Sequence, residues 1–416
     1  MSPHIGTLFF RDGEEIFREG DPGHHAYAIE SGEVEISVVR DGLNIVLARS
    51  GKGEMVGEMA ILDDKPRSAT ARAVGDCELL VITRQQITGR LQQADPVLRL
   101  CVDVLMERFR DIMKTGFGVA SDQEFAAFPP PPGKDRPAFT RRAAIAAMGD
   151  VRLEQELRLA IERDQLELAY QPIVHLGDRQ PAGFEALVRW IHPERGPIPP
   201  NVFIPLAESS GLIKLLDSWV MRTACAAAAD FRKQAGGLHP FVAVNCSPKD
   251  LADSRFAEKF REACAAARVP PSAMKLEITE SAFVDDPAQV VRALNTCRDL
   301  GATIALDDFG TGYSSLSYLH RFPIDAMKID RSFINAMGQD TLSASIVRSM
   351  VNLGRDLDLA IVAEGIETED QAESIRRLGC GLGQGYHFAK PLPFAEARDF
   401  LRSSQDNGHR RRGLAL

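Results

Sequence analysis

From Phe184 onward, this 416-residue chain repeats one pattern seven times: a short apolar run carries a carboxylate, an amide or a lysine. Helix-like stretches separate the runs. Repeated strand–helix units that deliver polar side chains from strand ends are typical of an α/β TIM-like (β/α)8 barrel, whose active site lies where the strands finish. The runs are Phe184–Trp190, Phe241–Asn245, Met274–Glu280, Thr303–Asp308, Ala326–Asp330, Ala360–Glu364 and Gly383–Phe388.

Acidic side chains gathered at one end of a barrel repel one another unless protons or metal ions neutralise them. We therefore expect a divalent-metal site. Its candidate ligands offer only oxygen donors, and the runs that carry them contain no His or Cys, which suits Mg²⁺ or Mn²⁺ better than Zn²⁺ or Cu²⁺. The candidates are Glu185, Asn245, Glu277, Asp307 and Asp308.

Two of these candidates, Asp307 and Asp308, are adjacent in the sequence. Successive strand residues face opposite sides, so both can serve one site only at a strand end or a bulge. Gly310 and Gly312 follow them and permit such a distortion. Adjacent carboxylates can bridge and flank two cations, an arrangement that polarises a phosphate and generates a hydroxide for in-line attack.

The motifs in these runs resemble the EAL-domain cyclic di-GMP phosphodiesterases, over a stretch from about Arg152 to Leu401. The resemblance implies a homodimeric enzyme that hydrolyses cyclic di-GMP to linear pGpG with two Mg²⁺ or Mn²⁺ ions. The motifs read Glu185-Ala186-Leu187, Val244-Asn245-Cys246-Ser247, Glu277-Ile278-Thr279-Glu280, Asp307-Asp308-Phe309-Gly310-Thr311-Gly312, Lys328-Ile329-Asp330, Ala363-Glu364-Gly365-Ile366-Glu367 and Gln384-Gly385-Tyr386.

The same resemblance implies individual roles in the reaction. The five candidate ligands would hold the metals, with Glu185 counted among the catalytic residues as well. Lys328 would contact the attacking water, and Glu364 would help to position it. Arg189 would grip a phosphate of the substrate.

Further roles implied by the resemblance concern substrate recognition and a loop. Gln171 would contribute to guanine recognition, and Gln384 would lie near the substrate. The loop Phe309–Ser315 resembles the segment that couples dimerisation to metal binding, with Glu280 as its anchor.

Each of these residues alone has a plainer interpretation. An acidic residue at a strand end is usually just solvated, and Lys328 alone could be a surface lysine or part of a structural ion pair. Seven motifs in family order favour an enzyme over the alternative, a non-catalytic effector that binds cyclic di-GMP and carries a vestigial nucleotide-binding domain.

The first quarter of the chain has shorter alternating runs, His25–Ile29, Gly32–Val38 and Asn44–Ala48, broken by glycine-containing turns such as Ser31-Gly32 and Asp41-Gly42. This spacing predicts a small antiparallel β-roll with flanking helices. The multidomain chain would therefore join this roll to the barrel.

A segment of the predicted roll, Val56–Ala71, has the composition of an anion site. Arg67 could make paired hydrogen bonds to a phosphate, and Glu58 is an acceptor suited to a ribose hydroxyl. The segment resembles the phosphate-binding cassette of the cyclic nucleotide-binding domain family. By that resemblance, main-chain groups around Gly57, Ser68 and Ala69 complete a cradle for cAMP or cGMP, and we favour cAMP. The alternative is a structural Glu58–Arg67 ion pair in a scaffold that binds nothing.

Residues Asp95–Thr115 carry apolar side chains at helical spacing and predict a helix. The resemblance to the nucleotide-binding family implies that this helix closes over the nucleotide and pairs in a dimer, and the alternative is a role in the core. A proline run, Pro129–Pro132, marks a spacer. We thus expect a sensor domain at 1–115, a linker at 116–139, an EAL domain at 140–405 and a basic tail at 406–416.

Global composition limits where the protein works and what it binds. The net charge of −9 disfavours DNA as a partner, and no apolar run is long enough to span a membrane. The seven cysteines are scattered, which is typical of reduced thiols in a cytoplasmic protein.

Overall fold

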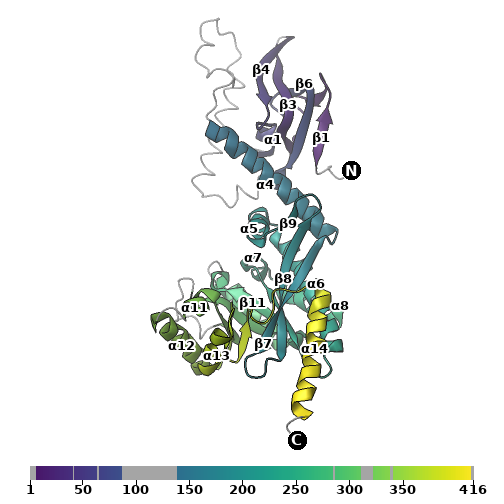
Figure 1. Ribbon diagram of the computed structural model, residues 1–416. Coiled ribbons are helices and arrows are strands. Elements are labelled where there is room, and N and C mark those ends of the chain that lie inside the picture. The colour runs from purple at the N-terminus through teal and green to yellow at the C-terminus, as the bar shows by residue number, and fades with distance from the viewer. Residues whose placement is uncertain are drawn as a thin grey trace. The chain divides into compact units, whose positions relative to one another are not determined.

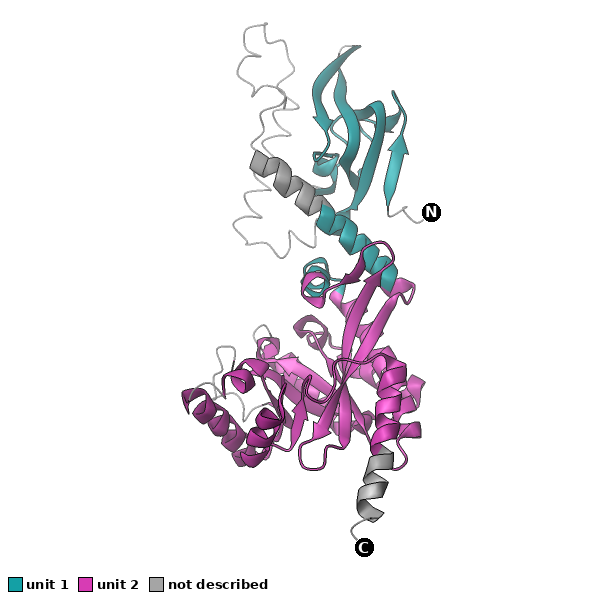
Figure 2. Cartoon of the chain, in the orientation of Figure 1, with its two compact units in different colours: residues 1–160, 203–212 teal, residues 161–202, 213–416 magenta. Residues whose placement is uncertain are grey.

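The computed structural model describes residues 6–40, 42–62, 65–86, 138–283, 286–310, 322–337 and 341–413 (Figure 1). The chain forms two compact units, residues 1–160 with 203–212 and residues 161–202 with 213–416 (Figure 2). The predicted helix Asp95–Thr115 and nearly all of the predicted linker lie outside the described residues. The domain boundaries expected from the sequence therefore stay a prediction.

The first unit contains a six-stranded antiparallel sheet, as the sequence predicts. Its central path runs β1-β6-β3-β4, while β2 pairs with β6 and β5 pairs with β3. A short helix, α1 (Glu58–Leu62), lies between β5 and β6 in the chain. The strands are β1 (Thr7–Phe10), β2 (Glu15–Phe17), β3 (His25–Arg40), β4 (Leu43–Gly51), β5 (Met55–Val56) and β6 (Thr70–Thr83).

The turn expected at Ser31-Gly32 is absent, and that prediction was wrong. Strand β3 instead continues through both residues, and two register shifts beside Ser31 accommodate them against β6. Gly32 has φ +84, and a Cβ there would lie 2.5 Å from the Asp76 carbonyl oxygen. Glycine is needed here because the chain bends within a strand and approaches its neighbour too closely for a side chain.

A long helix, α4 (Ala138–Glu162), packs onto this sheet. Val151 is 5% exposed and belongs to an apolar cluster that also contains Ile61 of α1 and strand residues Ala26, Ala28, Leu80 and Ile82. Two polar contacts fix the helix. Gln155 Nε2 donates to the Val81 carbonyl oxygen at 2.8 Å, and Arg152 Nη2 lies 2.9 Å from Glu30 Oε2. Helix α4 is therefore part of the first unit's core up to Ala160.

The second unit contains a barrel of eight strands, closed by the pairing of β10 with β8. All seven runs predicted from the sequence are strands or begin with one, and the fold class is confirmed. Small and branched apolar residues such as Ala243, Leu276 and Val362 are buried along them. The barrel strands are β7 (Leu166–His175), β8 (Pro181–His192), β10 (Phe241–Asn245), β11 (Met274–Thr279), β12 (Thr303–Phe309), β13 (Ala326–Ile329), β14 (Ala360–Ala363) and β15 (Leu382–Gln384).

One strand departs from the all-parallel arrangement that repeated strand–helix units predict. Strand β7 runs antiparallel to both of its neighbours, β8 and β15. The cause is local: only five residues, 176–180, join β7 to β8, too few for a crossover helix, so the two strands form a hairpin. Beyond the barrel, β8 continues into a second hairpin with β9 (Gly196–Ile198).

Helices follow most of the barrel strands (Figure 1). Helix α13 illustrates why one begins where it does: Thr368 and Gln371 form a capping box that satisfies backbone N–H groups of the first turn. None of the helices in the described part of the chain is both long and apolar enough to cross a lipid bilayer. The helices are α5 (Pro200–Ser210), α6 (Ile213–Gln234), α7 (Pro248–Leu251), α8 (Phe256–Ala267), α9 (Pro287–Asp299), α11 (Arg331–Ala336), α12 (Thr341–Asp356), α13 (Glu369–Arg377) and α14 (Phe394–Gly413).

Candidate active site

Lys328 on β13 lies at the centre of the polar cluster that the strand ends form. Its side chain is 1% exposed. The Nζ atom lies within 2.7–3.5 Å of four carboxylates. Three of them lie on the strands β8, β11 and β12, and the fourth directly follows β14. The distances are 2.7 Å to Glu364 Oε1, 2.9 Å to Glu277 Oε2, 3.1 Å to Asp307 Oδ1 and 3.5 Å to Glu185 Oε2.

Three amide side chains surround Glu185. Gln384 Nε2 donates to Glu185 Oε2 at 2.7 Å and to Gln171 Oε1 at 3.0 Å, while Asn245 Nδ2 donates to Glu185 Oε1 at 2.9 Å. Burial opposes ionisation of Glu185, yet Lys328 and these amide donors together lower its pKa. Both carboxylate oxygens are therefore held in place, and Glu185 has a fixed orientation.

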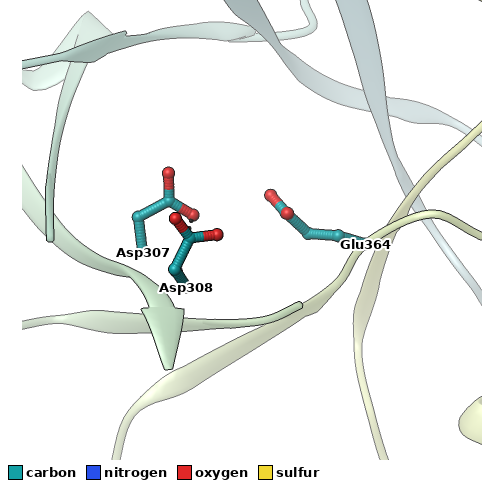
Figure 3. A group of neighbouring side chains, drawn as sticks. All are labelled: Asp307, Asp308 and Glu364. Carbon is teal, nitrogen blue, oxygen red and sulfur yellow. Dashed lines mark hydrogen bonds between the residues drawn. The ribbon is translucent and has the colours of Figure 1, made fainter. Parts of the chain in front are cut away.

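Asp307 and Asp308 reach one site through a distortion of β12, as the sequence predicts. The pairing of β12 with β13 shifts register between Leu306 and Phe309, and Asp308 has φ +53. Asp is one of the few residues that tolerate this left-handed conformation. Figure 3 shows the two carboxylates side by side, with Glu364 directed toward them, and the three residues offer oxygens within 4.8 Å of one another.

The charge of this cluster is incompletely balanced within the described residues. Burial raises the pKa of Glu277 well above its usual range and raises that of Glu364 to about 7, despite the nearby lysine. Burial acts against the Lys328 ammonium, but the carboxylates, led by Glu185 and Glu277, raise its pKa well above the usual range. The lysine therefore remains charged, and it neutralises only part of the acidic cluster.

The donor set fits a divalent metal ion. In the described part of the chain, Glu277 Oε1 is buried within the site and has no hydrogen-bond partner. A buried carboxylate oxygen without a partner is unfavourable unless a cation or a water occupies the space beside it. The atoms that the candidate ligands can offer to a metal ion are all carboxylate or amide oxygens, which hard cations such as Mg²⁺ prefer.

Two predicted site residues stand apart from the cluster. Arg189 lies four residues after Glu185 on β8, is half-buried, and donates from Nη1 to the Val188 carbonyl oxygen at 2.9 Å. Burial lowers the pKa of Arg189, while Tyr386 and Glu185 partly oppose the shift. Glu280 begins the short 3₁₀ helix Glu280–Phe283 directly after β11. Most of the loop it was expected to anchor lies outside the described residues, so the anchoring role stays a prediction.

The nucleotide cassette of the first unit is organised around Arg67, which is 5% exposed. Its Nη1 donates to the Gly57 carbonyl oxygen at 2.7 Å and its Nη2 to the His25 carbonyl oxygen at 2.6 Å. The guanidinium also lies 4.2 Å from the centroid of the Phe17 ring. Its Nε is buried and has no partner in the described part of the chain. Arg67 is thus a buried cation whose hydrogen-bonding capacity is not exhausted.

The other cassette residues lie around this arginine. Gly57 has φ +81, and a Cβ there would lie 2.5 Å from Arg67 Nη1, so the position requires glycine. Glu58 begins α1, and although burial raises its pKa, Arg67 lowers it in part. Ser68 Oγ contacts Met59 Sδ at 3.6 Å, and Ala69 is buried. Glu58 and Arg67, which both belong to the described part, form no direct ion pair, so the structural-pair alternative lacks support.

Sequence reasoning did not foresee two features. Lys328 was expected to contact a water, and its position among four carboxylates was not predicted, because the sequence places those residues on separate strands. The contacts of α4 with the first unit were also missed. The sequence carries no clear periodic signal for these contacts, because they rest on one apolar residue, Val151, and two polar ones, Arg152 and Gln155.

Comparison with known proteins identifies both parts of the chain. A family model described as "EAL domain" matches residues 154–391, and one described as "Cyclic nucleotide-binding domain" matches residues 7–94. The first match covers more than half of the chain. The chain therefore belongs to the EAL-domain family.

Individual relatives agree with this assignment. Cyclic di-GMP phosphodiesterase NbdA of Pseudomonas aeruginosa is 42% identical over 267 residues, which cover 64% of this chain and 34% of NbdA. The chain thus spans about a third of the length of the curated relatives it matches. The EAL enzyme Bd1971 in its cAMP-bound form is 32% identical, with a TM-score of 0.62 over 95% of this chain and all of that one. The PaMucR phosphodiesterase in complex with c-di-GMP is 42% identical, with a TM-score of 0.56 over 59% of this chain and 99% of that one.

Proposed function

We propose that the chain hydrolyses cyclic di-GMP to linear pGpG with two Mg²⁺ or Mn²⁺ ions, and that a cyclic mononucleotide bound to the first unit regulates this reaction. One observation carries the catalytic part: a buried lysine ammonium lies among four carboxylates whose negative charge it balances only in part. The names of NbdA and PaMucR support the reaction, and the c-di-GMP complex of PaMucR supports the substrate.

The acidic cluster would hold the metal ions. When bound, such ions polarise a phosphate and supply a hydroxide at neutral pH. Glu277 Oε1 is a buried ligand oxygen of this site that has no hydrogen-bond partner among the described residues. The proposed ligands are the five expected from the sequence, Glu185, Asn245, Glu277, Asp307 and Asp308.

The remaining residues of the site would position the water and the substrate. The Lys328 ammonium would donate a hydrogen bond to the attacking water, and Glu364, 2.7 Å from Nζ, would orient that ammonium. Arg189 presents a half-buried guanidinium, which suits bidentate contact with a phosphate. Gln384 would fix Glu185 and lie near the substrate, and Gln171, which accepts a hydrogen bond from Gln384, would contribute to guanine recognition.

The regulatory part rests on the cassette. Arg67 is buried, charged and has an unpartnered Nε in the described part of the chain, which favours a cyclic phosphate as its ligand. Glu58 would accept a hydrogen bond from the ribose, and main-chain groups at Gly57, Ser68 and Ala69 would complete the cradle. We favour cAMP over cGMP as the effector. Bd1971 has been solved in cAMP-bound and cGMP-bound forms, which supports this class of ligand.

Helix α4 provides a route by which the cassette would act on the barrel. Ile61 of the cassette helix α1 shares an apolar cluster with Val151 of α4. Helix α4 ends at Glu162, and β7, which carries Gln171, begins at Leu166. A shift of α1 on nucleotide binding would therefore alter the packing of a helix that leads directly into the first barrel strand.

Equilibrium binding combined with product analysis tests this proposal against a non-catalytic effector that binds cyclic di-GMP. The purified chain, incubated with cyclic di-GMP and Mg²⁺, should bind the substrate and release pGpG, and saturating cAMP should change the rate. Binding without any linear product would favour the effector. We also propose that the chain forms a homodimer, which sedimentation velocity would detect.

A further inference from the structure

Lys328 contacts carboxylates that a cation bound to this cluster would also need. Its Nζ atom contacts carboxylate oxygens of Glu277, Asp307, Glu185 and Glu364 at 2.7–3.5 Å. Mg²⁺ binds such oxygens at about 2.1 Å and also needs several of them at once. The ammonium and a metal ion would therefore draw on the same carboxylates, most directly Glu277 and Asp307, which Lys328 contacts at Oε2 and Oδ1.

The Lys328 ammonium also balances part of the negative charge of the four carboxylates. In the part of the chain that the structure describes, no other lysine or arginine pairs with these four carboxylates. Removing the only partner of a buried charge is strongly destabilising, because the remaining charge is left in a medium of low polarity. Without metal ions, Lys328 is thus the cation that makes the cluster compatible with a folded barrel.

We propose that Lys328 is the built-in counter-ion of the metal-free site and that it lowers metal affinity by competing with divalent cations for Glu277 and Asp307. This role is separate from contact with the attacking water, and it rests on the proposed metal-dependent function. Lys328 would hold the ligand cage together in the absence of metal and yield part of its carboxylate contacts when metal binds.

A role for Lys328 in ordering the metal ligands would have the opposite effect on metal affinity. If Lys328 mainly orders the ligands, a neutral side chain of similar length leaves them disordered and weakens metal binding. If Lys328 competes, the same substitution removes a positive charge from the site and strengthens metal binding. The variant Lys328→Met therefore distinguishes the two.

Lys275 offers a matched control on the same barrel. It lies on β11 two residues before Glu277, is 6% exposed, and faces the same side of the strand as Glu277. Its Nζ lies 4.0 Å from the centroid of the Phe241 ring, and within the described residues it pairs with no carboxylate. Lys275→Met thus removes a buried lysine close to the site without removing a contact to the acidic cluster.

The test measures Mn²⁺ binding to the full-length chain, without substrate, by competition with a fluorescent chelator. Thermal unfolding is recorded in parallel with chelator and with saturating Mn²⁺. We expect Lys328→Met to lower the Kd for Mn²⁺ at least about tenfold. Its melting temperature in chelator should fall, so that the stabilisation by Mn²⁺ exceeds that of wild type. Lys275→Met should change the Kd far less than Lys328→Met, because Lys275 acts on Glu277 without contacting it.

Several outcomes decide the matter. Unchanged or weaker Mn²⁺ binding by Lys328→Met overturns the counter-ion role. A Lys328→Met protein that folds only when Mn²⁺ is present supports it, and Lys328→Arg, which keeps the charge, should then fold without metal. If neither wild type nor Lys328→Met binds Mn²⁺, the proposed metal-dependent function itself is wrong.

Discussion

Gln171 lies directly opposite Glu185 across the antiparallel pair of β7 and β8. Gln384 from the neighbouring strand β15 donates hydrogen bonds to both side chains. The one antiparallel strand of the barrel thus brings an amide beside a carboxylate that we assign to the metal site. The hydrogen bonds to Glu185 fix its orientation, and such contacts commonly change metal affinity 10–100-fold.

Replacement of Gln384 should therefore weaken metal binding although Gln384 is not a proposed ligand. We expect Gln384→Ala to raise the Kd for Mn²⁺ by roughly tenfold or more, because Glu185 loses the donor at its Oε2 atom. Chelator competition measures the effect. Gln234→Ala serves as the control and should bind Mn²⁺ like wild type. It removes an amide on α6 that donates a hydrogen bond to Asp230. Equal affinities for all three proteins would contradict the orienting role.

Removal of the proposed catalytic groups should separate binding from turnover. Glu185→Ala and Asp307→Ala should abolish hydrolysis of cyclic di-GMP, because each removes a proposed metal ligand. Lys328→Ala should lower the rate by at least about a hundredfold and still bind the substrate, because we propose that Lys328 acts on the attacking water. Rates come from pGpG formation, and binding comes from calorimetry. Rapid hydrolysis by Glu185→Ala or Lys328→Ala would disprove the assignment.

Glu280 should matter for the loop that follows β12, although it is not a proposed ligand. It begins the 3₁₀ helix three residues after Glu277. We expect Glu280→Ala to shift the Mg²⁺ dependence of hydrolysis several-fold toward higher concentrations or to weaken dimerisation. A Mg²⁺ titration combined with sedimentation velocity measures both. If Glu280→Ala matches wild type in both experiments, Glu280 does not anchor the loop.

The sequence predicted most of the barrel because strand periodicity and polar strand ends are local signals. The runs around Glu277 and Asp307 are examples, and even the bulge at Asp308 followed from two adjacent acids before a glycine. The reversed direction of β7 could have been inferred only from the short connection to β8. The convergence of carboxylates on Lys328 is a tertiary property, because it depends on how strands far apart in sequence are placed around a closed barrel.

Regulation should depend on Arg67 for binding and on α4 for coupling. Arg67→Ala should weaken cAMP affinity roughly 10–100-fold, because a charge-assisted pair of hydrogen bonds is lost. The double variant Arg152→Ala, Gln155→Ala should keep cAMP affinity and basal hydrolysis but lose most of the rate change, since it removes the polar contacts of α4 with Glu30 and Val81. Typical allosteric coupling free energies correspond to changes in affinity of roughly 5–150-fold.

A control on the same helix completes this experiment. Arg158→Ala removes an arginine of α4 for which the structure gives no ion pair within the described residues, and it should respond to cAMP like wild type. Wild type that binds neither cAMP nor cGMP contradicts the sensor assignment. A double variant that responds fully to cAMP contradicts only the route through α4.

The most direct test of the proposed function is the initial rate of pGpG formation from cyclic di-GMP as a function of Mg²⁺ concentration. The measurement starts from protein stripped with chelator and uses Asp307→Ala as a parallel sample. We predict no product without metal, a saturable rise with Mg²⁺ for wild type, and no product from Asp307→Ala at any concentration. Product formation that is independent of Mg²⁺, or equal in both proteins, would contradict a metal-dependent phosphodiesterase centred on Lys328 and its four carboxylates.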